Sequence, residues 1–159
     1  MNRVGIGYDL HRLTEGRALI LGGVTVPFEK GAVSHSDGDV LAHAICDALL
    51  GAAGLGDIGT HFPDSDPKWK GVSSLRFLEQ VDNLLEEHGW KIDHVDAIVI
   101  AERPKLNPHF PAMRHTLAQA LGVDIARIHL KAKTNEGADA VGRGEAIAAH
   151  VVATLARAA

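Results

Sequence analysis

The sequence predicts a single α/β domain that spans residues 1–159, and three observations support this prediction. Segments with alternating apolar residues, typical of strands, are interspersed with segments in which apolar residues recur every three or four positions, as in helices. A chain of 159 residues with 46% hydrophobic content has enough apolar material for one core. No internal repeat, low-complexity tract or linker divides the sequence.

The first half of the chain is predicted to contain a strand, a hairpin, a helix and a long loop. Apolar residues alternate near the N-terminus, two short apolar runs flank Gly22-Gly23, and the following apolar residues recur every three or four positions. These patterns are typical of a strand, a hairpin and a helix, respectively. The next segment is rich in glycine, proline and aspartate without a period, which is typical of a functional loop. In order, the four elements are expected at residues 4–8, 18–26, 39–54 and 54–71.

The second half is predicted to contain two helices, two strands and an ambiguous tail. The first helix ends at Gly89, and the second begins at Asn107-Pro108, a pair typical of an N-cap and a first helical residue, and ends at Gly122. The tail contains many alanines, which favour a helix, but its isoleucine and valines also permit a strand. In order, these elements are expected at residues 73–88, 95–101, 107–122, 128–132 and 145–157.

Composition excludes several classes of function. A formal charge of −4, from 16 basic and 20 acidic residues, provides no global attraction for nucleic acid or an anionic membrane. The single cysteine, Cys46, excludes an internal disulfide, and its apolar neighbours indicate a small buried side chain. Neither a signal peptide nor an apolar run of about 18 residues is visible, so we expect a cytoplasmic protein.

Three side chains are candidates for a catalytic zinc site. Asp9 and His11 lie two apart on the predicted N-terminal strand and therefore point to the same side. His43, on the first predicted helix, would complete three protein ligands with a fourth position open, the arrangement of a catalytic zinc. Cys46 lies on the apolar side of the helix and cannot supply a fourth ligand. The alternative is a polar strand end with a solvated histidine.

The residues before that helix have a structural explanation only in part. Ser36 and Asp39, three apart, match the general pattern of a capping box at a helix N-terminus. This pattern does not account for His35, nor for His43 and Asp47, which are four apart and share a helix face.

Four other polar stretches are each compatible with a ligand or with ordinary surface structure. In residues 56–67, aspartates among glycines could bind hydroxyl groups or could form turns. Basic residues in 101–107 precede a helix start, a plausible phosphate or nucleotide contact. In 131–136, two lysines, a hydroxyl and a carboxylate could hold a phosphate and a magnesium ion. Arg143 and Glu145 could form a surface ion pair.

The order of these motifs resembles that of the 2-C-methyl-D-erythritol 2,4-cyclodiphosphate synthase family of non-mevalonate isoprenoid biosynthesis. The resemblance covers essentially the whole chain and rests on GYDLHRL, HSDGD with the following histidine, GDIG, FPDSDP, AERPKLNPH, KAKTNEG and GRGE. It implies that 4-diphosphocytidyl-2-C-methyl-D-erythritol 2-phosphate is converted to the cyclic diphosphate with release of CMP. It also implies a homotrimer of α+β subunits, each a mixed sheet with helices on one face, with active sites between neighbours. By this resemblance the tail is a strand.

The resemblance also implies roles for individual residues. Zinc would be held by Asp9, His11 and His43, and a second divalent ion, Mg²⁺ or alternatively Mn²⁺, by Glu136, while His35 and Thr134 would stabilise the transition state. Residues 57–59 and 62–66 would surround the methylerythritol portion, 101–107 the cytidine, and 133–136 the diphosphate, the last two from the partner subunit. The implied substrate-contacting residues are Asp9, His11, His35, Ser36, Asp57, Ile58, Gly59, Phe62, Pro63, Asp64, Ser65, Asp66, Ala101, Glu102, Arg103, Pro104, Lys105, Leu106, Asn107, Lys133, Thr134, Asn135, Glu136, Ala140 and Arg143.

The sequence departs from the family pattern at several positions. Lys133 and Asn135 stand where many members have threonines, and Gly137 where some have lysine. Ala140 replaces a common aromatic residue, which weakens the implied site for an anion or isoprenoid diphosphate on the trimer axis near Arg143. Two alternatives are a zinc-dependent phosphoesterase and a trimeric isoprenoid-diphosphate-binding protein without turnover. The absence of a transit peptide favours a bacterial cytoplasm.

Overall fold

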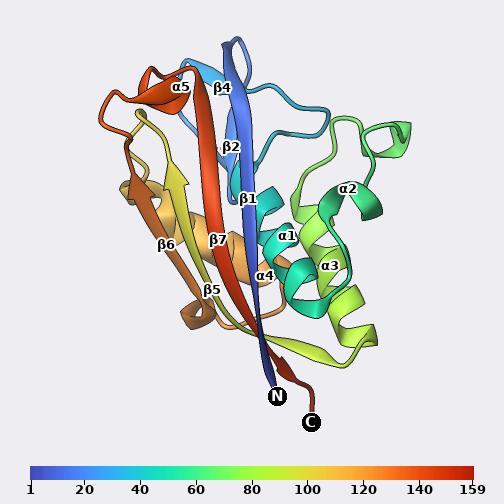
Figure 1. Cartoon of the computed structure of the whole chain (residues 1–159). Coiled ribbons are helices and arrows are strands. Elements are labelled where there is room, and N and C mark those ends of the chain that lie inside the picture. Colours follow the sequence, from blue (N-terminus) through green and yellow to red (C-terminus); the bar gives the residue numbers. More distant parts are fainter.

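A computed structural model describes residues 1–159 and contains one five-stranded mixed sheet (Figure 1). The strand order is β4-β1-β7-β5-β6, with antiparallel pairing everywhere except between the parallel strands β5 and β6. The strands are β1 (Asn2–Glu15), β4 (Lys30–Ala32), β5 (Trp90–Ile100), β6 (Ile128–Lys133) and β7 (Ala146–Arg157). Strands β2 (Leu19–Leu21) and β3 (Val24–Val26) form the predicted hairpin beside this sheet.

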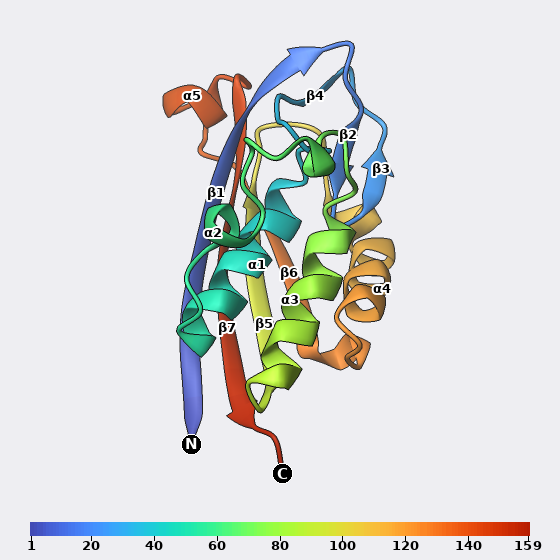
Figure 2. The same cartoon turned by 90° about the vertical axis from the view of Figure 1, so that its right-hand side faces the viewer.

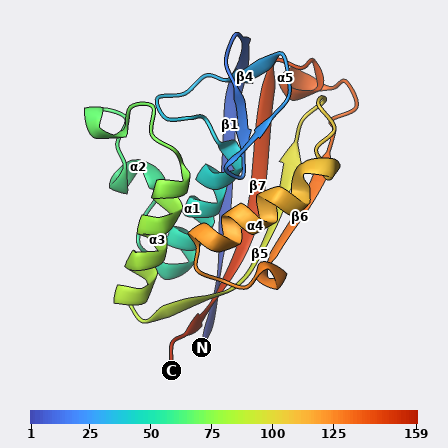
Figure 3. The ribbon, with the colours of Figure 1, turned by 180° about the vertical axis from the view of Figure 1, so that it is seen from behind.

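Three helices cover one face of the sheet and leave the other face open (Figures 2 and 3). They are α1 (Val40–Ala53), α3 (Leu75–Glu87) and α4 (Phe110–Ala120). The main core of 39 buried residues lies between these helices and the sheet. Short helical turns lie in the connections: α2 (Ile58–His61), η1 (Pro67–Trp69), η2 (Asn107–His109), η3 (Ile125–Arg127) and α5 (Asp139–Gly142). None of the helices has both the length and the apolar content needed to cross a lipid bilayer.

Two glycines allow α1 to lie directly against β1. A Cβ atom added at Gly5 would come within 2.0 Å of the Ala48 carbonyl oxygen, and one added at Gly7 within 1.8 Å of the Ala44 carbonyl oxygen. Because residues two apart on a strand point to the same face, the row that begins with Gly5 and Gly7 continues with Asp9 along the surface of α1. This close approach aims the polar end of β1 at the N-terminal end of α1.

The alternate residues of β1 point to the open face of the sheet. Val4 is 68% exposed, Ile6 is 75% exposed and Tyr8 is 51% exposed, and Val152 of the neighbouring β7 is 47% exposed. The predicted alternation of the first strand is therefore confirmed, but its apolar side faces away from the core rather than into it. An uncovered apolar sheet face of this kind is typical of an interaction surface.

The tail is a strand, as the resemblance implied. β7 is hydrogen-bonded to β1 on one side and to β5 on the other. Its inward-facing residues, including Ile147, Val151 and Leu155, are at most 1% exposed. Pairing on both edges and burial together outweigh the helix propensity of its alanines.

The two predicted helix caps are wrong in detail. Asp39 itself caps α1 by accepting a hydrogen bond from the Ala42 amide, so Ser36 lies outside the helix and forms no capping box. Asn107 begins a short 3₁₀ turn, and the regular helix α4 begins only three residues later, at Phe110. Asn107 is therefore not at the N-cap position of α4 and makes no capping bond to it. Cys46 is fully buried, as predicted.

Candidate metal centre and active site

Three potential metal ligands meet where β1 passes the N-terminal end of α1. Asp9 and His11 extend the glycine row of β1 toward the helix, and His43 approaches from α1. Asp9 Oδ2 lies 2.9 Å from His11 Nε2 and 3.0 Å from His43 Nδ1, and the two imidazole nitrogens are 3.1 Å apart. The structure therefore brings together the three residues that the sequence predicted as zinc ligands.

This donor set fits a tetrahedral metal ion with one open position. Ligand atoms about 2.0–2.1 Å from a tetrahedral zinc are separated from each other by roughly 3.3 Å, close to the spacing found here. Two imidazole nitrogens and one carboxylate oxygen suit zinc and other borderline divalent ions. The three side chains are the group in the chain whose chemistry and spacing could hold a metal.

The charges of the cluster stabilise one another even without an ion. Burial acts to raise the pKa of Asp9, but hydrogen bonds from His11 and His43 outweigh it and lower the pKa to about 2. Burial opposes the charged form of His43, but the hydrogen bond to Asp9 and its charge outweigh burial and raise the pKa of the imidazole. A carboxylate that is ionised at neutral pH, beside two imidazoles, is a favourable environment for a cation.

His43 is held from behind by hydroxyl groups. Its Nε2 lies 2.8 Å from Ser74 Oγ and 3.1 Å from Ser36 Oγ. The Ser74 hydroxyl in turn donates to a carboxylate oxygen of Asp37. Ser74 is fully buried at the start of α3, so a residue far away in the sequence supports His43.

A cavity of about 330 Å³ opens in front of the three ligands. Its apolar wall contains Phe62 and Phe77, whose rings stack with centroids 4.6 Å apart, and Trp69, whose ring meets both at steep angles. The cavity is lined by Asp9, His11, Ser34, His35, Ser36, His43, Ile58, Gly59, Phe62, Pro63, Asp64, Trp69 and Phe77. The cavity thus combines a polar floor, formed by the candidate metal ligands, with an apolar wall, and its volume is about that of a small-ligand site.

The loop over this cavity is held in place by hydrogen bonds that involve side chains. Asp47 accepts a 2.7 Å hydrogen bond from the Ile58 amide, which ties the start of α2 to α1. Asp57 caps α2 by accepting from the amide and the hydroxyl of Thr60. His35 Nε2 lies 3.4 Å from the Asp66 carbonyl oxygen at the far end of the loop. Two of the three loop aspartates that the sequence proposed as ligand contacts, Asp57 and Asp66, therefore have structural roles as well, since their side chains accept hydrogen bonds within the loop, whereas Asp64 lines the cavity.

A second cleft, of about 400 Å³, lies at the opposite edge of the sheet. It is formed where β5 and β6 end and is lined by Ala101, Glu102, Pro104, Lys105, Leu106, Asn107, Pro108, Ala132, Lys133 and Thr134. The side-chain oxygen Glu102 Oε2 is buried and has no hydrogen-bond partner. Two strand spacings of roughly 4.8 Å separate β5 from β1 and three separate β6 from β1, so the candidate metal ligands of the same chain are roughly 10 Å or more from this cleft.

The remaining predicted residues lie near this second cleft but outside it. Arg103 pairs with Glu29 at 2.7 Å, Arg143 pairs with Glu145 at 3.2 Å, and Glu136 is exposed in the turn after β6. The surface ion pair predicted from the GRGE motif is therefore confirmed. One chain does not bring Thr134 or Glu136 to the metal ligands.

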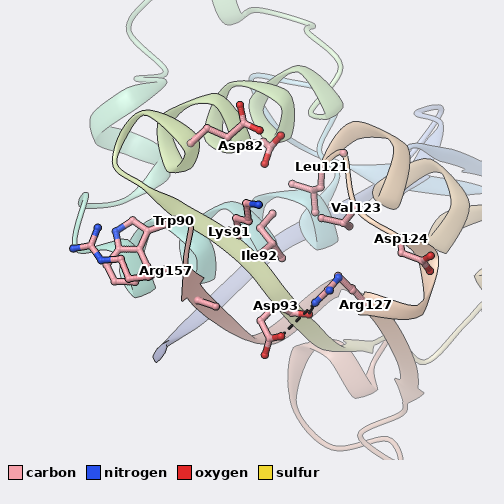
Figure 4. Close-up of a pocket in the computed structure, with 13 residues that line it drawn as sticks. Asp82, Trp90, Lys91, Ile92, Asp93, Leu121, Val123, Asp124, Arg127 and Arg157 are labelled. Carbon is pink, nitrogen blue, oxygen red and sulfur yellow. Dashed lines mark hydrogen bonds and ion pairs between the residues drawn. The ribbon is translucent and has the colours of Figure 1, made fainter. Parts of the chain in front are cut away.

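A larger cavity, of about 460 Å³, contains none of the predicted residues (Figure 4). It lies where the end of α3, the start of β5 and the connection from α4 to β6 meet. Both of its arginines have partners in the chain: Arg127 pairs with Asp93 at 3.3 Å, and Arg157 lies over the Trp90 ring at 4.1 Å. Size alone therefore does not identify the active site.

Sequence reasoning did not find four residues that shape the metal centre. Ser74 and Asp37 support His43, and Trp69 and Phe77 form the aromatic wall. Asp37 lies inside the HSDGD motif and could have been noticed there. Ser74 is a serine before a helical pattern, a signal of helix capping rather than of metal binding.

Comparison with known proteins gives a consistent result. The family model described as the YgbB family matches residues 2–156. A relative from Desulfosudis oleivorans, named 2-C-methyl-D-erythritol 2,4-cyclodiphosphate synthase, is 60% identical over 153 residues, covering 96% of this chain and 91% of the relative. A relative from Clostridium perfringens with the same name is 54% identical over 155 residues, covering 98% of this chain and 99% of the relative.

Solved structures agree in fold. A 2C-methyl-D-erythritol-2,4-cyclodiphosphate synthase in a form with bound CDP is 43% identical, with a TM-score of 0.89, and covers 97% of this chain and 100% of its own. The bifunctional IspDF from Campylobacter jejuni is 41% identical with a TM-score of 0.95; it covers 99% of this chain, which spans 42% of that longer protein. The chain therefore belongs to the YgbB family, the family of the 2-C-methyl-D-erythritol 2,4-cyclodiphosphate synthases.

Proposed function

We propose that this protein converts 4-diphosphocytidyl-2-C-methyl-D-erythritol 2-phosphate into 2-C-methyl-D-erythritol 2,4-cyclodiphosphate and CMP, a step of isoprenoid precursor biosynthesis. The observation that carries the proposal is the convergence of Asp9, His11 and His43 at a cavity in a member of this synthase family. In the reaction, an oxygen of the 2-phosphate forms a bond to the β-phosphorus. The bond from that phosphorus to the CMP oxygen breaks, and CMP leaves with the electron pair.

The metal ligands would hold zinc, and Glu136 of a neighbouring subunit would hold a second divalent ion, Mg²⁺ or Mn²⁺. When bound, such ions supply Lewis acidity and a template for phosphate oxygens. With Asp9, His11 and His43 as its protein ligands, a tetrahedral zinc would still be able to accept a substrate phosphate oxygen. Phosphoryl transfer depends mainly on positioning and charge neutralisation, so the chain needs no nucleophile of its own.

The residues around the cavity would position the two ends of the substrate. His35 and Ser36 lie at the metal-binding floor, where a phosphate would contact them. The α2 loop, from Asp57 to Asp66, would hold the diol and exclude water. Folding the substrate so that its two phosphates meet makes the attack intramolecular, and this is a large source of acceleration.

The nucleotide half of the site would come from the second cleft of a neighbouring copy. Residues 101–107 would contact the cytidine, and 133–136 the diphosphate. Two features support this arrangement: the two halves lie at opposite edges of one sheet, and the open face of that sheet is apolar near β1. We therefore propose a homotrimer whose active sites lie between subunits. The GRGE arginine, Arg143, would face the trimer axis near Ala140.

The reaction is tested by phosphorus NMR of the purified protein with the substrate, zinc and magnesium. Two coupled resonances of a cyclic diphosphate should appear together with CMP and should be absent with a chelator. Linear phosphate products would indicate a zinc phosphoesterase. No conversion by the metal-loaded protein would indicate a binding protein without turnover.

The assembly is tested by mixing two inactive variants. His43→Ala removes a proposed zinc ligand from the metal half of the site, and Glu136→Ala removes the proposed ligand of the second ion from the nucleotide half. Each homotrimer is expected to assemble but to be inactive. In randomly mixed trimers with sites between subunits, about a quarter of the sites combine two intact halves, so about a quarter of the parent activity should return. No activity in the mixture would place both halves of each site in one subunit.

A further inference from the structure

We propose that Ser74 and Asp37 form a positioning relay that fixes which nitrogen of His43 faces the metal. The inference rests on the proposed metal site but concerns two residues outside the ligand set. It follows from the direction of the hydrogen bonds behind the imidazole ring.

The proton of the Ser74 hydroxyl is donated to Asp37. Ser74 Oγ donates to Asp37 Oδ1, and a carboxylate can only accept. Because a hydroxyl has a single proton, Ser74 Oγ can only accept a hydrogen bond from His43 Nε2, which lies 2.8 Å away. Nε2 of His43 therefore carries a proton.

The opposite nitrogen of the ring is consequently free to bind a cation. In a neutral imidazole with a proton on Nε2, Nδ1 has the lone pair. Nδ1 is the atom that lies 3.0 Å from Asp9 Oδ2 and 3.1 Å from His11 Nε2, inside the ligand cluster. Metal-bound histidines commonly donate their second N–H to an outer group that fixes tautomer and orientation, and here that group is Ser74.

The relay is itself rigid. Asp37 accepts from the Ser74 amide at 2.9 Å and from the Asp39 amide at 3.0 Å, in addition to the Ser74 hydroxyl. Ser74 occupies the N-cap position of α3, yet its side chain makes no capping hydrogen bond. Serine at this position usually caps the helix. Here its hydroxyl is turned away from the helix, toward Asp37 and His43.

Ser36 gives weaker support from the other side. Its Oγ lies 3.1 Å from His43 Nε2, so the proton on that nitrogen is shared between two hydroxyl oxygens. Because Ser36 also lines the cavity, a change at Ser36 would alter the substrate pocket as well. Ser74 does not line the cavity and is therefore the residue with which the relay can be tested separately.

The first test measures zinc affinity by competition with a chromophoric chelator, without substrate. Ser74→Ala should weaken zinc binding by about 10- to 100-fold, the usual effect of removing an outer hydrogen-bond partner of a metal-bound histidine. Ser73→Ala is the matched control, since Ser73 is the exposed neighbour and its side chain makes no hydrogen bond; its affinity should stay within about twofold of the parent. Parent-like affinity in folded Ser74→Ala protein would overturn the relay. A parent protein that binds no zinc would instead overturn the metal site.

The second test needs no variant and holds even if Ser74→Ala fails to fold. Nitrogen-15 NMR of the zinc-loaded parent reports which nitrogen of His43 carries the proton and which binds the ion. The proton is expected on Nε2. A proton on Nδ1 would overturn the inference, whatever the zinc affinity.

Discussion

Replacing Gly7 by alanine is expected to separate β1 from α1 and thereby to disrupt both the fold and the metal centre. The added Cβ would lie 1.8 Å from the Ala44 carbonyl oxygen and 2.8 Å from the Ala48 amide nitrogen. Both are backbone atoms in the middle of a helix, so no side chain can rotate away. Because ordinary van der Waals contact begins at 3.4 Å, strand and helix must move apart by about 1.6 Å.

Both consequences can be given a magnitude. Overpacking a core typically costs about 1–3 kcal/mol, and a clash with backbone belongs at the upper end of this range. For a chain of this length, a loss of about 3 kcal/mol lowers the melting temperature by roughly 6–12 °C. Asp9 follows Gly7 by two residues and His43 precedes Ala44 by one, so the displacement falls on the ligands. Metal–ligand distances tolerate about 0.2 Å, so zinc affinity should fall more than about tenfold.

Thermal unfolding and zinc competition, measured on the same sample, provide the assay. Gly51→Ala is the matched control on the same helix, because its added Cβ would meet only the Ile6 carbonyl oxygen, at 4.0 Å. Removing a helical glycine there should stabilise the protein by about 0.5–1 kcal/mol and leave zinc affinity unchanged. If Gly7→Ala melted with the parent and bound zinc equally well, the close approach of β1 and α1 would not be what positions the ligands.

Three further predictions concern stability and the loop. Burial and the nearby Glu86 raise the pKa of Asp82 in the folded protein to about 6. The folded state therefore favours the protonated carboxyl, and the stability that is fully present below the unfolded-state pKa is lost as the pH rises through about 6. Asp82→Asn should therefore raise the free energy of urea unfolding by about 1 kcal/mol at about pH 8, after allowance for solvent screening, and change it little at about pH 4. The buried Asp39 carboxylate accepts hydrogen bonds from the amides of Gly22, Gly23 and Ala42. In Asp39→Asn, the side-chain nitrogen would face one of these donors, so the free energy of urea unfolding should fall by about 2 kcal/mol. Unchanged stability would refute this account. Asp47→Ala removes a hydrogen bond to the Ile58 amide worth about 1–3 kcal/mol, so hydrogen exchange of that amide should become at least about tenfold faster. The same change should raise KM more than it lowers kcat. An Ile58 amide that stays protected would show that other contacts hold the α2 loop.

The convergence of the three candidate metal ligands could be predicted from the sequence because their geometry is largely local. The two-residue spacing of Asp9 and His11 places both on one face of a strand, whatever the rest of the fold. Joining them to His43 required only that this face meet the first helix. The small residues before Asp9, Gly5 and Gly7, are what permits that contact, although the alternation alone did not indicate which face would be covered.

The supporting residues could not be predicted because they depend on long-range packing. Ser74 is 31 positions from His43 in sequence, and its role exists only because α3 packs beside α1. A serine before a helical pattern predicts a side chain that caps the helix. In the folded chain the Ser74 side chain instead bonds to His43 and Asp37. The tail strand is a similar case: the alanines of β7 favour a helix locally, and the strand results from pairing with β1 and β5.

The two halves of the proposed site differ in how closely they are tied to the fold. The metal half lies on the β1–α1 contact, so the packing that stabilises the subunit also sets the distances between Asp9, His11 and His43. The nucleotide half lies at the ends of β5 and β6, where Lys133, Thr134 and Glu136 are exposed and carry no core packing. Substitutions that loosen the core should therefore reduce zinc affinity in parallel with stability, whereas substitutions of the exposed Lys133, Thr134 or Glu136 should affect the proposed reaction alone. Of the departures from the family pattern, Lys133 falls in this second group, whereas Gly137 and Asn135 also shape the turn after β6. Gly137 has a φ of 80°, in the left-handed region that favours glycine, and the Asn135 amide donates hydrogen bonds to the Asp139 carboxylate.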